Sequence, residues 1–119
     1  MNKCFTLIIK KKWFDMEISR DKKDEYRKIK TYYTSRLCRI WCENYLHIKY
    51  KKSEQNNFIN WLKSKGKIDF GSVLFINGYS AKSRRFIAEC TLRIGTGRTE
   101  WGAELGEEYY VFGIKINGD

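Results

Sequence analysis

The segment 22–27, with the sequence KKDEYR, holds the side chains of this chain that are best suited to chemistry. In an extended strand Lys23, Glu25 and Arg27 face one way, and Lys22 joins them if the preceding turn brings it round. A lysine whose pKa is lowered by burial can act as a base while an arginine holds phosphate charge. The alternative is an ordinary strand whose charged side chains form ion pairs with neighbouring strands and carry no chemistry. Composition alone favours this alternative.

Other catalytic or metal-binding patterns are absent from the sequence. It contains no Ser/His/Asp order, phosphate-binding loop, dinucleotide fingerprint or zinc motif. The single histidine, His47, falls in an alternating apolar and polar stretch and is expected at the surface. Cys38 and Cys42 are four residues apart, but with one histidine nearby they make a poor zinc set. We expect these two and Cys4 and Cys90 to be buried, reduced thiols, with no metal and no cofactor.

A second group of residues, between positions 77 and 101, suits nucleic-acid binding better than catalysis. It combines arginines for phosphate, aromatic rings for stacking and an amide for a base edge, the mixture that readers of single-stranded RNA use. The group consists of Asn77, Tyr79, Arg84, Arg85, Arg98 and Trp101. For Tyr79 and Trp101, packing in a hairpin or the core is about as good an interpretation as stacking. Because Arg84 and Arg85 are adjacent in a strand, at most one of them faces any given surface.

The net charge of +10 is concentrated in one half of the chain. Residues 1–52 carry 15 basic and 6 acidic side chains, whereas residues 53–119 carry 9 and 8. A one-sided basic surface attracts polyanions, although it can also serve solubility alone. The aromatic residues interleaved with the basic ones in the first half favour a nucleic acid as the partner.

Length and composition limit the class of protein. A chain of 119 residues makes one domain, and 42% hydrophobic with 16% aromatic residues argues against disorder. The early apolar run, residues 4–9, is too short for a signal peptide or a membrane span, so we expect a cytoplasmic protein with no membrane contact.

Periodicity and turn residues predict an α+β fold. A small barrel flanked by helices suits the order of these elements. Strands are expected at 4–9, 23–27, 46–50, 73–76, 85–94 and 109–116, and helices at 11–19, 32–41 and 54–65. Thr31 and Ser53 are the expected helix caps, and Gly66 is the expected stop of the third helix.

The stretch 19–27, SRDKKDEYR, resembles the Gly-x-Lys-x-x-Glu-x-Arg signature of ASCH domains, a family of the PUA-like superfamily. Residues 7–15 are similar to the strand and Lys-x-Trp-Phe-Asp run that precede the signature, and residues 29–36 to the segment that follows it in small phage and Firmicutes members. Further segments occur in the family's order, namely FINGY at 75–79, IGTG at 94–97 and WGAE at 101–104. The resemblance implies that residues 1–119 form a single ASCH domain with an insertion at 42–66.

The resemblance implies a PUA-like mixed or antiparallel barrel of about five to six strands, with two to three helices and a cleft beside the signature. It also implies RNA binding and, for some members, metal-independent cleavage of single-stranded RNA. Lys22 would be the acid/base or phosphate ligand, Arg27 would hold phosphate charge and Glu25 would orient both. Lys23, Tyr26 and Arg36, in or next to these motifs, join the predicted nucleic-acid-binding residues.

Two departures from the family pattern keep other functions open. Arg20 occupies the position of a family glycine, at the end of a helix, where the residue usually has a positive φ. One branch removes the acetyl group of N4-acetylcytidine, a modified nucleoside, but it has threonine where this chain has Glu25.

A further alternative is a phage-type, non-enzymatic inhibitor that binds a host protein through 42–66. The barrel edge allows a monomer or a weak dimer.

Overall fold

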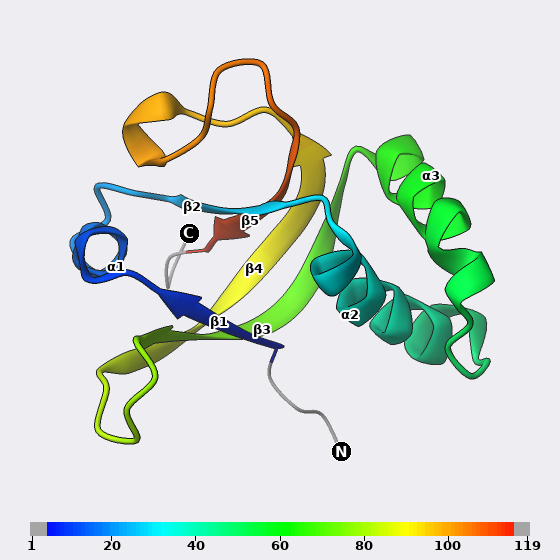
Figure 1. Cartoon of the computed structure of the whole chain (residues 1–119), viewed down its shortest axis with the longest axis horizontal. Helices are drawn as coiled ribbons and strands as arrows, with labels where there is room; N and C mark the ends of the chain where they lie inside the picture. Colours follow the sequence, from blue (N-terminus) through cyan, green and yellow to red (C-terminus); the bar gives the residue numbers. More distant parts are fainter. Residues whose placement is uncertain (1–4, 116–119) are drawn as a thin grey trace.

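One curled sheet of five strands organises the part of the chain that the computed structural model describes, residues 5–115 (Figure 1). The strand order is β1-β3-β4-β5-β2, in which β1 runs parallel to β3 and every other neighbouring pair is antiparallel. The strands are β1 (Phe5–Ile9), β2 (Asp24–Lys28), β3 (Lys67–Asn77), β4 (Arg85–Gly95) and β5 (Tyr109–Ile114). The predicted α+β class is confirmed, in the form of a mixed sheet curled into a half-barrel with three helices.

The helices lie at opposite ends of this sheet (Figure 1). They are α1 (Lys11–Ile18), α2 (Thr31–Trp41) and α3 (Gln55–Lys65). α2 and α3 lie side by side, and α1 lies near the other end, beside the start of β2. This places the segment that carries Lys22 between α1 and β2, far from α3.

The core fills the concave side of the sheet. β1 alternates strictly, with Phe5, Leu7 and Ile9 buried, as expected for a strand with one face on the core. From the segment 42–66, the side chains of Phe58 and Leu62 enter the same core. Burying each of these two contributes about 1.5–3 kcal/mol, so α3 is an integral part of the packing.

The two edge strands, β1 and β2, are joined by side chains. The Arg27 guanidinium on β2 donates to the backbone carbonyl of Ile8, with an Nη2–O distance of 2.8 Å. Arg36 on α2 donates in the same way to the carbonyl of Thr6, at 3.2 Å. Thr6 and Ile8 are two residues apart, so their carbonyls point to the same side of β1. The Arg27 guanidinium thus bridges the seam between β1 and β2, where a closed barrel would have a backbone ladder, and the Arg36 guanidinium holds α2 to the same edge of β1.

Most predicted elements are present, but the strand expected at 46–50 is wrong. α2 continues into a π-helical turn (Cys42–Leu46), and His47 then takes a left-handed conformation with φ of 58°. The alternation of Leu46, Ile48 and Tyr50 has a different origin, because Ile48 and Tyr50 pack on the core from an irregular segment. A five-residue alternating pattern does not reveal whether a partner strand exists. In addition, its first residue, Leu46, belongs to the π-helical turn.

Both predicted helix caps are also wrong, because each helix begins at a different residue. Thr31 is already the first residue of α2, and Ser53 lies in a 3-10 turn (Lys52–Glu54) ahead of α3. Neither helix has a side-chain hydrogen bond at its N-cap. Gly66 does end α3, with φ of 73°, which confirms the stop. Cys4 and Ile116, predicted strand ends, lie outside the described residues. None of the helices in the described part is long and apolar enough to cross a membrane.

Candidate functional site

The structure brings three predicted catalytic side chains together and adds a fourth from α1. The Lys22 ammonium lies 3.2 Å from Glu25 Oε1 and 3.6 Å from Glu17 Oε2. Arg27 Nη2 lies 3.0 Å from the other Glu25 oxygen. Sequence reasoning missed Glu17, since nothing in the signature points to it, although α1 was predicted. We call Glu17, Lys22, Glu25 and Arg27 the buried charge cluster.

Lys22 is enclosed within this cluster. Its side chain is only 1% exposed, and its ammonium also donates to the backbone carbonyl of Asp24. The rings of Trp13 and Tyr26 lie over the ammonium, with centroids at 5.6 Å and 5.0 Å. In this conformation the Lys22 amine has no open side from which a substrate could approach.

Burial and mutual contact shift the pKa values of Glu17 and Glu25 in opposite directions. Burial, reinforced by Glu25, raises the pKa of Glu17 from 4.5 to about 10. Burial also acts to raise the pKa of Glu25, but the hydrogen bond with Glu17 and the charges of Lys22 and Arg27 outweigh it, so that pKa is lowered. Neither Glu17 oxygen has a hydrogen-bond partner within the described chain, and burial without a partner costs a neutral carboxyl less than a charged one. The raised pKa of Glu17 and the lowered pKa of Glu25 thus favour one carboxylic acid and one carboxylate.

The turn after α1 is what brings Lys22 inward. Arg20 has φ of 71°, the left-handed conformation for which the family has a glycine. The amides of Arg20 and Lys22 then donate to the carbonyls of Glu17 and Met16, at 3.2 Å and 3.0 Å. The chain folds back over the last turn of α1 and directs Lys22 under it. Lys23, the next residue, is exposed and does not join the cluster, contrary to the expectation from strand alternation.

The loop after β4 contacts side chains that surround Lys22. A Cβ added at Gly97 would lie 2.5 Å from the Tyr26 ring, and one added at Gly102 would lie 3.1 Å from Trp13. The Tyr26 hydroxyl accepts a hydrogen bond from the Arg98 amide, at 2.9 Å. The loop therefore packs closely on the two rings that cover Lys22, and this contact leaves no room for a side chain at 97.

Arg98 and Trp101 lie together on this loop, as predicted, but Arg98 is already paired. Its guanidinium lies 2.6 Å from Glu100 and 4.6 Å from the centroid of the Trp101 ring. Arg98 is exposed and Trp101 half-buried. This pair forms the outer surface above Tyr26.

The predicted residues of the β3–β4 hairpin are divided between different contacts. Tyr79, at the tip, is 90% exposed, so core packing is not its role. Arg84 lies over the Phe14 ring and pairs with Asp15 of α1 at 3.3 Å, whereas Arg85 donates to carbonyls of its own turn. The backbone N–H of Asn77 closes the hairpin by donating to the backbone carbonyl of Arg84, at 2.9 Å. These residues lie on the hairpin, apart from the buried charge cluster.

Arg36 is on α2 and has a different environment. Its guanidinium lies over the rings of Phe5 and Tyr32, at 4.3 Å and 5.1 Å, and the next arginine, Arg39, lies 4.5 Å from the ring of Tyr50. No carboxylate within residues 5–115 pairs with either guanidinium. Sequence reasoning missed Arg39, although its three-residue spacing from Arg36 places both on one helix face.

The described cysteines are buried and unbonded. The sulfurs of Cys38 and Cys42 lie 3.9 Å apart, and burial, with Cys42 next to it, raises the pKa of Cys38 to about 12. Burial also raises the pKa of Cys90 to about 12, which keeps this thiol protonated. Along residues 5–115, no three His, Cys, Asp or Glu side chains gather into a group that could hold a metal ion.

Comparison with known proteins adds no identification. No family model matches the chain, and no curated protein or solved structure matches it either. The ASCH resemblance and the roles that it implies therefore stay predictions.

Proposed function

We propose that this protein binds single-stranded RNA on the outer face of α2. Tyr32, Arg36 and Arg39 are spaced by four and three residues, which places them on one side of a helix. We call these three residues the α2 stripe. The observation that carries the proposal is that both guanidinium groups lie against aromatic rings without a carboxylate partner in the described chain.

This chemistry matches what a single strand offers. A guanidinium supported by a ring keeps its outward N–H groups for phosphate oxygens, and an exposed ring stacks on a base. Tyr32, with 61% of its surface exposed, provides such a ring. The cations predicted on the hairpin and the loop are less suitable, because Arg84 and Arg98 are already paired with Asp15 and Glu100.

The proposal includes the PUA-like, ASCH-type assignment. Two observations support it: Lys22, Glu25 and Arg27 converge, and Arg20 has positive φ at the position of the family glycine. We restrict the proposal to binding, since Lys22 is enclosed. Cleavage would require the loop at 97–102 to move off Tyr26 first, and it is assayed separately, with EDTA present and with Lys22→Ala.

The test is the affinity of the protein for a labelled oligouridine, measured by fluorescence anisotropy over a range of salt. Wild-type affinity should fall steeply with salt, and Arg39→Gln should weaken binding several-fold and reduce the magnitude of the salt slope by about 0.7, the value for one phosphate contact on a single strand. Lys63→Gln is the matched control, because it removes one charge from a residue of α3 that pairs with Glu108 at 3.7 Å.

Two results would count against this function. One is the absence of salt-dependent binding to any RNA by the wild-type protein. The other is an equal loss in Arg39→Gln and Lys63→Gln, because that would mean that RNA responds to net charge alone. Deleting 42–66 would remove Phe58 and Leu62 from the core, so this alternative is tested by substituting exposed residues of the segment. Loss of a protein partner in such variants, with RNA binding intact, would instead favour the inhibitor alternative.

A further inference from the structure

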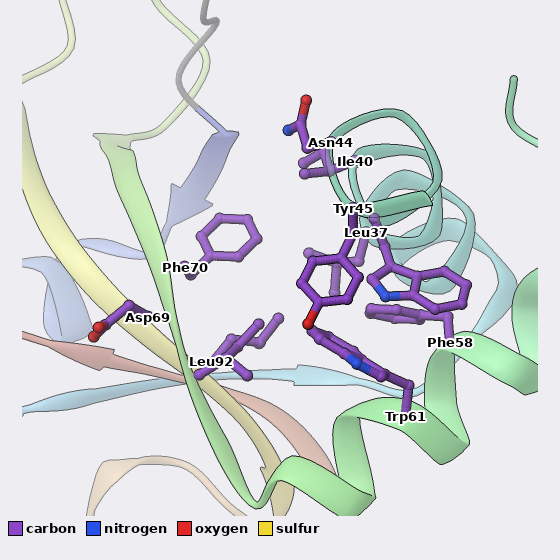
Figure 2. A pocket seen from close by; sticks show the side chains of 11 residues that line it. Leu37, Ile40, Asn44, Tyr45, Phe58, Trp61, Asp69, Phe70 and Leu92 are labelled. Atoms are coloured by element: carbon purple, nitrogen blue, oxygen red, sulfur yellow. The ribbon is translucent and has the colours of Figure 1, made fainter. Parts of the chain in front are cut away.

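A cavity of about 140 Å³ lies between α2, α3 and the sheet, at the opposite end of the molecule from the buried charge cluster. Figure 2 shows Phe70 and Asp69 of β3 on one side of it, and Tyr45, Phe58 and Trp61 on the other. Five of the eleven lining residues are aromatic, and four of the others are aliphatic.

One wall of this cavity carries an unused hydrogen-bond donor. Trp41 lines the cavity and is 8% exposed, and its Nε1–H has no hydrogen-bond partner among the described residues. Buried donors are nearly always paired, because leaving one unpaired forfeits its interaction with water. This nitrogen is enclosed, so an acceptor atom entering the cavity would reach it only if a neighbouring side chain moved aside.

Size and lining together define the class of ligand. An apolar protein cavity of about 150 Å³ holds a benzene ring, so this one has room for a single planar ring with small substituents. Aromatic walls favour a flat π-system, and the Trp41 donor requires that the ring carry a carbonyl oxygen or ring nitrogen. A pyrimidine base has these properties, whereas a phenylalanine side chain lacks the acceptor.

The position of the cavity relative to the α2 stripe favours a nucleic acid over a protein partner. Arg36 and Arg39 lie on α2, and so do Leu37 and Ile40, which line the cavity about a third of a turn further round the helix. A helix with its side chains is about 10 Å across, so phosphates on the stripe and a base in the cavity can belong to one strand. Arg36 and Arg39, which have no carboxylate partner in the described chain, would repel a basic peptide and attract this strand.

We propose that this cavity is a pocket for one unpaired pyrimidine base of the bound RNA. The proposal rests on the proposed function, since the α2 stripe would hold the phosphates next to the base. Tyr45, 56% exposed and 4.8 Å from the Trp61 ring, is the wall that faces solvent. It can turn aside to admit the base without disturbing the core.

The first experiment compares two ligands of equal charge, a uridine hexanucleotide and an abasic ribose-phosphate hexanucleotide. Both strands are compared in a Tyr32→Ala background, because Tyr32 can itself stack on a base. The base-bearing strand should still bind at least about five-fold more tightly, the smallest effect expected for one stacked base. Equal affinity for the two strands in this background would overturn the pocket while leaving phosphate binding by Arg36 and Arg39 intact. If neither strand binds, both proposals fall.

The second experiment changes the pocket. Trp41→Phe removes the donor and keeps an apolar ring, and it should weaken binding of the uridine strand by about two- to ten-fold, the effect of one hydrogen bond, without changing binding of the abasic strand. Tyr45→Ala removes a largely exposed wall, so it should leave folding intact and reduce the same base-dependent part. If both variants keep the full preference for uridine, or if indole saturates the pocket without competing with the uridine strand, the assignment is wrong.

Discussion

Replacing Arg20 with glycine should stabilise the protein, although it removes a residue beside the site. Arg20 is exposed, has φ of 71°, and its side chain has no hydrogen bond or ion pair within the described chain. The left-handed conformation costs a residue with a Cβ about 1–2 kcal/mol, and glycine escapes this cost. Glycine also gives the unfolded chain more freedom, which returns about 0.4–1 kcal/mol. The net gain should be about 0.5–1 kcal/mol.

The assay is urea unfolding followed by tryptophan fluorescence, with Arg20→Ala as the control. Arg20→Ala removes the same charge and side chain but keeps the Cβ, so it should be as stable as the wild type within about 0.5 kcal/mol. Arg20→Gly should exceed Arg20→Ala, with a melting temperature that is a few degrees higher for a domain of about this size. If Arg20→Gly is no more stable than Arg20→Ala, the turn is not under the strain that its φ indicates.

Three further outcomes follow from the contacts around Lys22. The pKa of Glu17 is raised in the folded state, so this carboxyl stabilises the fold below about pH 4.5 and the contribution is lost as pH rises toward about 10. Glu17→Gln should therefore gain stability over the wild type as pH increases, by at most about 1.4 kcal/mol per unit in urea titrations at several pH values, and a constant difference would contradict a neutral Glu17. Gly97→Ala should lower the free energy of unfolding by about 1–3 kcal/mol, because the added Cβ would clash with the Tyr26 ring. Acrylamide should then quench more of the tryptophan fluorescence. Unchanged stability would refute the close contact. Arg27→Met should lower the free energy of unfolding by about 3 kcal/mol or more, since it leaves Glu25 and the Ile8 carbonyl with fewer partners. A loss below about 1 kcal/mol would show that the Arg27 guanidinium is not needed to hold β1 and β2 together.

Local patterns predicted the elements well where the pattern and the packing coincide. The alternation at 5–9 and the apolar spacing around Leu37, Phe58 and Leu62 report burial directly, because the same side chains fill the core. The strand at 46–50 failed because alternation reports which side chains are buried and not what they are hydrogen-bonded to. The full length of β3 was missed since Asp69 and Gly71 interrupt its pattern at a bulge, where the register with β4 shifts.

The site was predicted in part for a similar reason. The signature located Lys22, Glu25 and Arg27, whose convergence depends on one turn and one short strand. It could not locate Glu17, since that contact depends on how α1 sits against β2, which is set by tertiary packing. Burial of Lys22 was also beyond reach, because it results from a loop some 75 residues further along the chain closing over Tyr26.

The side-chain seam between β1 and β2 sets where this fold opens first. Separating the two strands breaks the guanidinium–carbonyl bond from Arg27 to Ile8, which contributes about 0.5–3 kcal/mol, whereas separating β3 from β4 breaks a ladder of nine residue pairs. Local opening should therefore begin at the seam. β1 then has a backbone ladder only with β3, whereas β4 has ladders on both sides, so the amides of β1 should exchange with solvent before those of β4. An open seam also exposes two strand edges at once, a template on which a second copy could exchange its β1.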